Sequence, residues 1–229
     1  MSILEVKHME YHSLALALHI LCGTVAIIAM ALAHLAKKGP NFHAKIGRIY
    51  CYSVLGVCVT AIALFLLGSS TFLLLIALFS LYLVLVGWRF ATNGKGAVTK
   101  VDSALVMAGV AGGVSLLVMS AFIAVSESAP LGQTRAFAAV PMTFGIISIL
   151  LAYQQHSMKK AGQNPRGKDR INLHVTYMGG GTISTVTAFT ITVFGSSVFT
   201  WLGATLVGTP LLIWNQAGVR TGRIATDIR

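Results

Sequence analysis

Seven histidines stand in a chain of 229 residues that is 55% apolar and only 10% charged. Ionisable side chains are costly at membrane depth, so they usually face a cavity, a partner or a ligand. Three of the histidines lie on or just before the first apolar run, namely His8, His12 and His19. The other four lie at the opposite ends of four different runs, namely His34, His43, His156 and His174. The two sets therefore suit different chemistry.

The second set could hold a metal or a haem iron, because such a centre needs ligands that converge from several directions. We expect haem b or a transition metal with ligands from this set, and His43 and His174 form the best pair. Arg48 and Tyr50 complete the expected cofactor site, where Arg48 could pair with a propionate or another acid group. A plainer interpretation stays open, in which helix-end histidines only bond backbone carbonyls.

The first set suggests a different function. His12 and His19 are seven residues apart, about 10 Å along one helix, which is too far for them to bind one ion together. His19 could instead be the buried titratable group of a small-solute or proton-coupled transporter. His12 and the threonine face of the sixth run, represented by Thr185, would then line the path. Threonine can also bond its own helix, so that face alone does not prove a polar cavity.

The elements that carry these residues are long apolar runs. The mean hydropathy of +0.79 is too high for a soluble domain with a polar surface. A helix needs about 20 apolar residues to cross a bilayer. The sequence therefore predicts an all-α, polytopic membrane protein, one transmembrane helical-bundle domain over residues 1–229. Its expected helices are residues 13–36, 46–68, 71–90, 102–126, 133–155, 174–194 and 197–216.

Seven helices place the two termini on opposite sides of the membrane. Counted along the sequence, 15 Lys and Arg residues fall on one side and 2, Lys7 and Arg135, on the other. The positive-inside rule predicts an external N-terminus and a cytoplasmic C-terminus, in the cell inner membrane. Very short turns near residues 68–70 and 195–197 predict helix one followed by three antiparallel hairpins. The longest loop, residues 159–170, is expected on the cytoplasmic side.

Composition excludes several functions. The net charge of +11 comes from basic residues between apolar runs, which indicates topology and a lipid partner and argues against nucleic acid. The six acidic residues avoid the middle of the runs, which argues against a carboxylate-driven pump. The three cysteines have no metal-clip spacing. No GxSxG or HExxH motif indicates a hydrolase. If the chain is an enzyme component, a membrane oxidoreductase with a small-molecule or redox partner is the expected kind.

Two sequence patterns predict where particular side chains lie relative to one another. His43 precedes a helix that ends at GSSTF, and His174 precedes one that ends at GSSVF, as a parallel repeat would place them. We therefore expect these two imidazoles to approach one another within reach of one shared ligand. Along helix one, leucines such as Leu18 and Leu21 share a lipid-facing stripe, while His19 lies on the opposite, small-residue stripe that faces the bundle.

Three segments carry a resemblance to a known family. They are HILCGTVAI from His19, KGPNFHAKIGRIY from Lys38, and HVTYM from His174. Together they resemble an uncharacterised family of predicted bacterial seven-helix integral-membrane proteins with a His-Arg-x-x-Gly-Arg-x-Tyr-like segment before helix two. Ala44 stands where that pattern has arginine. The resemblance implies no established activity, and it makes one set of residues the family's signature positions: His19, His43, Gly47, Arg48, Tyr50 and His174.

Overall fold

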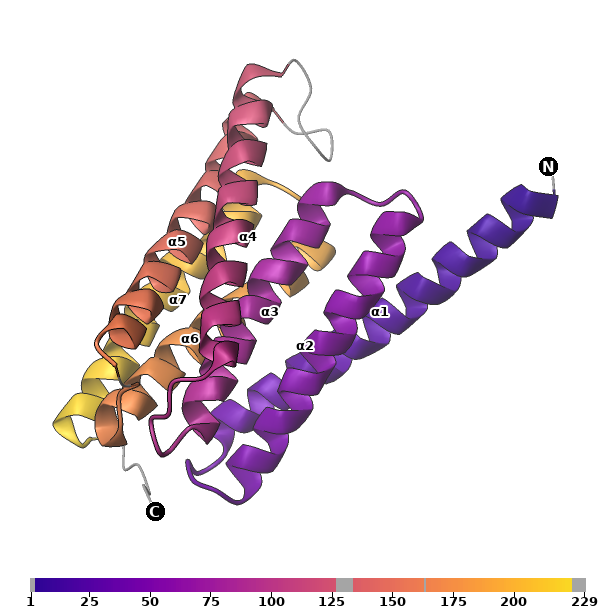
Figure 1. The fold of residues 1–229 in the computed structure, drawn as a ribbon. Helices are drawn as coiled ribbons and strands as arrows, with labels where there is room; N and C mark the ends of the chain where they lie inside the picture. Colours follow the sequence, from indigo (N-terminus) through magenta and orange to yellow (C-terminus); the bar gives the residue numbers. More distant parts are fainter. Residues whose placement is uncertain (1–2, 127–133, 163, 224–229) are drawn as a thin grey trace.

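The computed structural model describes residues 3–126, 134–162 and 164–223. This part of the chain contains seven α-helices, one short 3-10 helix and no strand (Figure 1). The helices are α1 (Ile3–Leu35), α2 (Phe42–Leu66), α3 (Thr71–Thr92), α4 (Lys100–Val125), η2 (Arg135–Ala138), α5 (Ala139–Lys160), α6 (Gly167–Phe194) and α7 (Val198–Thr221). The all-α class and the seven helices are as the sequence predicts.

Six stretches of the described chain are long and apolar enough to cross a bilayer: α1, α2, α3, α4, the continuous η2 and α5, and α7. The seventh helix, α6, is 28 residues long but less apolar. Its first turns contain Lys168, Asp169 and Arg170, and six threonines follow. Neighbouring helices contact α6 on several sides, since it packs against α3, α7 and α1.

Helix ends differ from the expected ones mainly by extension. α1 begins ten residues before position 13, because polar residues such as Glu5 and Glu10 continue the helix beyond the apolar run. α5 continues to Lys160 and α6 begins at Gly167, so half of the loop expected over residues 159–170 is helical. Apolar length marks the membrane-crossing part of a helix and not its hydrogen-bonded end, which explains these errors.

α3 lies at the centre of the bundle. It packs against α2, α4 and α6, and α1 contacts both α2 and α6. The helices α1, α2, α3 and α6 therefore form one closed ring of contacts. The helices α3, α4, α5, α7 and α6 form a second ring, which shares α3 and α6 with the first (Figure 1). Both predicted cofactor histidines belong to the first ring, because His43 lies on α2 and His174 on α6.

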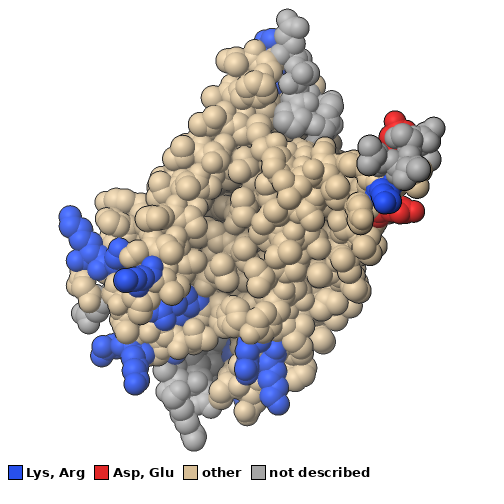
Figure 2. Space-filling view, turned by 45° about the vertical axis from the view of Figure 1, so that its right-hand side comes forward, with Lys and Arg blue, Asp and Glu red and all other residues tan. Residues whose placement is uncertain are grey.

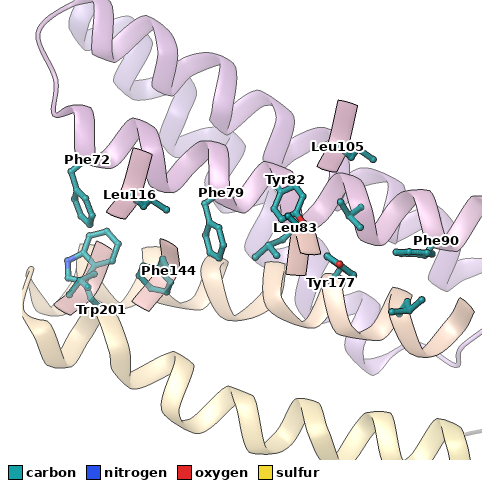
Figure 3. Packing of buried hydrophobic residues seen from close by; sticks show 14 of the residues in the cluster. Phe72, Phe79, Tyr82, Leu83, Phe90, Leu105, Leu116, Phe144, Tyr177 and Trp201 are labelled. Atoms are coloured by element: carbon teal, nitrogen blue, oxygen red, sulfur yellow. The ribbon is translucent and has the colours of Figure 1, made fainter. Parts of the chain in front are cut away.

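Aromatic side chains fill the second ring. Trp201 on α7 is 1% exposed, and its ring centroid lies 5.0 Å from that of Phe72 on α3 and 6.4 Å from that of Phe144 on α5. Farther along α3, Tyr82 meets Tyr177 of α6 edge-on, with ring centroids 6.3 Å apart (Figure 3). This packing fixes α3 against α6, the helix that carries His174.

Glycines allow two close helix crossings. A Cβ at Gly113 of α4 would lie 3.0 Å from the Gly145 carbonyl oxygen of α5, so these backbones nearly touch. A Cβ at Gly87 of α3 would lie 2.9 Å from the backbone nitrogen of Met178 on α6. Small residues at such crossings let transmembrane helices approach closely. The second crossing lies at the level of the histidine pair.

The predicted faces of α1 are confirmed. Leu18 and Leu21 are 45% and 59% exposed, whereas Ala15 and Ala26 are buried. His19 lies on the inner face, where its Nδ1 atom is 2.9 Å from the Thr60 hydroxyl of α2. An imidazole that bonds a neighbouring helix avoids the cost of an unpaired polar group in hydrocarbon.

One end of the bundle, hereafter the basic end, carries the α1–α2, α3–α4 and α5–α6 connections. Lys and Arg side chains gather there, on the left and lower sides of the molecule in Figure 2. The carboxylate of Asp102, which is 2% exposed, lies within this end. Arg89 donates to both of its oxygens, at 3.0 and 2.9 Å. Asn164 donates to the same carboxylate at 3.3 Å, so one acidic group joins the α3–α4 connection to the α5–α6 connection.

Candidate histidine site

His43 and His174 lie next to each other at the basic end. Their ring centroids are 6.4 Å apart and their planes are nearly perpendicular, at 89°. His43 is in the first turn of α2, and His174 is two turns inside α6. The expected approach of the two imidazoles is thereby confirmed. Because they come from different helices, they can contact one ligand from two directions.

Each imidazole is oriented by a backbone carbonyl on a third and a fourth helix. The His43 Nδ1–H donates to the Ala33 oxygen of α1 at 3.0 Å, and the His174 Nδ1–H donates to the Gly87 oxygen of α3 at 2.9 Å. A carbonyl can only accept, so each neutral ring carries its proton on Nδ1 and its lone pair on Nε2. A ligating histidine commonly makes this same bond with its second nitrogen. The pair is therefore compatible with both readings of the sequence, carbonyl bonding and ligation.

Tyr50 lies on the same face of α2 as His43, two turns farther from the basic end. It is 2% exposed, and its hydroxyl is 2.9 Å from that of Thr185 on α6. Gly181 leaves room for this contact, since a Cβ there would be 3.3 Å from the Tyr50 oxygen. Thr185 also donates to the Gly181 carbonyl, so Tyr50 is the donor between the two hydroxyls. Tyr50 thus holds α2 against α6.

Arg48 has a different setting from Tyr50. Its side chain is exposed, and its Nε atom donates to the Ala44 carbonyl of its own helix at 3.3 Å. His34 and His156 are also exposed, and His34 Nδ1 donates to the Met30 carbonyl of α1. Within the described ranges, no three His, Cys, Asp or Glu side chains are grouped so that they could hold a metal ion. The structure thus brings together two of the four expected metal ligands.

The residues of the expected solute or proton path contact neighbouring helices singly. His19 bonds Thr60, as described above, and His12 Nε2 is 3.5 Å from the Ser69 hydroxyl at the α2–α3 turn. Five of the six threonines of α6 donate their hydroxyls to carbonyls four residues earlier in the same helix, namely Thr176, Thr185, Thr187, Thr190 and Thr192. These hydroxyls are used by the helix itself, as the plain interpretation of the threonine run expects.

The sequence alone did not identify two residues that lie beside the histidine pair, Lys38 and Gly87. Lys38 donates to the Ala33 carbonyl that His43 also bonds. Gly87 supplies the carbonyl for His174 and the space for Met178. A glycine within an apolar run suggests a close approach, and a lysine just past a helix end suggests a carbonyl cap. Neither signal indicates that the residue lies beside a particular histidine.

Comparison with known proteins gives no match, whether with family models, curated proteins or solved structures.

Proposed function

We propose that this protein is a membrane oxidoreductase component that holds haem b, or another transition-metal centre, between His43 and His174. The observation that carries the proposal is the geometry of the pair. Two metal–nitrogen bonds of about 2 Å and two ring radii place the centroids of opposed imidazole ligands about 6 Å apart. The centroids of His43 and His174 are 6.4 Å apart.

The donor set favours haem over a bare metal ion. A structural or catalytic zinc site has three or four protein ligands, whereas the described residues bring two histidines together and no third His, Cys, Asp or Glu. A porphyrin supplies four nitrogens of its own, so His43 and His174 would be the two protein ligands that such an iron needs. The bound iron would accept and release one electron. The Ala33 and Gly87 carbonyls would fix the ring orientation and raise the basicity of the ligating nitrogens.

The proposed setting is the cell inner membrane, with the N-terminus outside and the basic end in the cytoplasm. The gathering of Lys and Arg at that end of the bundle supports this orientation (Figure 2). The centre would then lie near the cytoplasmic surface, where a soluble redox partner or a small molecule can approach it.

The test is the absorption spectrum and metal content of protein purified in mild detergent. We expect a haem spectrum or a stoichiometric metal in the wild type, and a loss of at least about tenfold in His43→Ala and in His174→Ala, since each variant removes one ligand. His34→Ala and His156→Ala are matched controls because both side chains are exposed, and they should retain the centre. A wild type without haem or metal, or full retention in both ligand variants, would contradict the proposal.

A second candidate function, proton-coupled transport of a small solute, has its own observation. Polar side chains meet between helices at successive depths of the first ring, from His12 and Ser69 through His19 and Thr60 to Tyr50 and Thr185. If protons follow this route, His19→Ala should reduce proton uptake into proteoliposomes at least about tenfold under an imposed membrane potential. The exposed His8 provides the control variant, His8→Ala. Uptake no greater than in protein-free liposomes would rule this function out.

A further inference from the structure

Lys38 lies in the short connection between α1 and α2. Its ammonium donates to the carbonyl oxygens of Ala33 and His34, each at 2.9 Å, at the C-terminal end of α1. Cations are favourable there because the last carbonyls of a helix lack intrahelical donors. The side chain is partly buried, and this burial lowers the pKa of Lys38 from its ordinary value. Capping of α1 alone explains two of its three donors.

The same carbonyl connects Lys38 to the histidine pair. The Ala33 oxygen is 2.9 Å from Lys38 Nζ and 3.0 Å from His43 Nδ1, so the ammonium lies no more than about 6 Å from the His43 ring. His174 follows, with its ring centroid 6.4 Å from that of His43. A positive charge thus stands beside the two imidazoles that are proposed to bind one group.

No described carboxylate compensates this charge. The carboxylate of Asp102, at the same end, is paired with Arg89. Arg170 of the same end donates from Nη1 to the Phe90 and Ala91 carbonyls at the end of α3. The acidic Asp169 of this end is exposed in the first turn of α6. The N-terminus of α2, next to His43, adds a partial positive charge. The surroundings of the pair are therefore positive and complement a ligand that carries negative charge.

We propose that Lys38 anchors a carboxylate of the group that His43 and His174 hold. This inference rests on the proposed haem function, since the carboxylates in question are the porphyrin propionates. The third N–H of the ammonium would donate to the propionate. The Ala33 carbonyl, which both side chains bond, fixes the position of Lys38 relative to His43. Arg48, the residue that the sequence suggested for this task, is exposed and bonds its own helix.

The experiment compares two probes on the full-length protein in detergent after removal of any bound haem. One probe is haem b, and the other is its dimethyl ester, in which both propionates are neutral. Absorbance titration gives a dissociation constant for each. Taking the ratio of the two constants within each variant cancels general effects on porphyrin binding. We expect the preference for haem over the ester to fall about tenfold in Lys38→Met and to survive in Lys38→Arg.

Lys37→Met is the matched control, because Lys37 is the exposed neighbour and should leave the preference unchanged. The ligation spectrum of each loaded variant shows whether both histidines still bind, which separates a lost anchor from a misfolded site. An unchanged preference in Lys38→Met would overturn the role of Lys38 while leaving the histidine site intact. Failure of the wild type to bind either porphyrin would overturn the haem site and this inference with it.

Discussion

Replacing Asp102 by alanine is expected to lower the free energy of unfolding by about 3 to 5 kcal/mol, because it leaves the Arg89 guanidinium without its counter-charge in a largely buried setting. Three further hydrogen bonds to the Asp102 carboxylate are lost in this variant. The Thr99 backbone N–H and hydroxyl donate to one carboxylate oxygen at 2.7 and 3.0 Å, and Asn164 donates to the other. The α3–α4 and α5–α6 connections would then keep only the bonds that Asn164 donates to the Gly96 and Ala97 carbonyls. Reversible unfolding in mixed detergent micelles measures this loss of unfolding free energy.

Asp169→Ala is the matched control for this variant. Asp169 is an exposed carboxylate in the first turn of α6, where its removal should cost at most about 1 kcal/mol. A loss for Asp102→Ala no larger than that of the control would show that the buried ion pair does not join the two connections.

Gly87→Leu is expected to disrupt the candidate site and to lower the free energy of unfolding by about 3 kcal/mol, since the new side chain overpacks a close helix crossing. A Cβ at this position would lie 2.6 Å from Met178 Cγ and 2.9 Å from the Met178 backbone nitrogen. A side chain can rotate away, but the backbone of α6 must shift. The bond from His174 to the Gly87 carbonyl should then break. Unfolding measurements and the haem or metal content of the purified variant report the two effects.

Gly112→Leu controls for a leucine in a transmembrane helix. A Cβ at Gly112 of α4 would meet no atom within 4 Å, so this variant should unfold like the wild type and retain its centre. If Gly87→Leu behaved in the same way, the close approach of α3 and α6 would not be needed for the site. Truncating Met178 to alanine should not rescue Gly87→Leu, because the backbone contact remains.

Patterns of local periodicity predicted much of the fold. The small-residue and leucine stripes of α1 predicted which face packs against the bundle, because the two opposite faces of a lipid-exposed helix differ in residue type. The shared GSS endings of two hairpins predicted the approach of His43 to His174, which the ring distance of 6.4 Å confirms. The first prediction depends on residues of one helix, and the second depends on the similar sequences at the ends of two helices. Neither requires knowledge of loop conformation.

Contacts between distant segments could not be predicted in this way. The position of Lys38 beside His43 depends on how the chain turns between α1 and α2. The importance of Asp102 depends on Arg89 and Asn164, which lie 13 and 62 residues away. Thr99 and Asp102 do form a capping box, a local pattern that predicts the start of α4 but not its distant partners. Such contacts follow from packing and are not encoded in any short motif.

The modest hydropathy of α6 has a consequence for biogenesis. A ribosome delivers α1 to α5 to the membrane first, and α6 follows with Lys168, Asp169 and Arg170 at its leading end. Charged residues and threonines weaken partition of an isolated helix into lipid. Contact with another helix is more favourable for α6 than contact with lipid. α3 offers such a contact at Gly87 and at Tyr82, whose ring packs against Tyr177. If α6 crosses the bilayer as the sequence predicts, its retention there depends on docking to a helix that is synthesised earlier. Defects at the α3–α6 crossing should then produce misinserted, rapidly degraded chains.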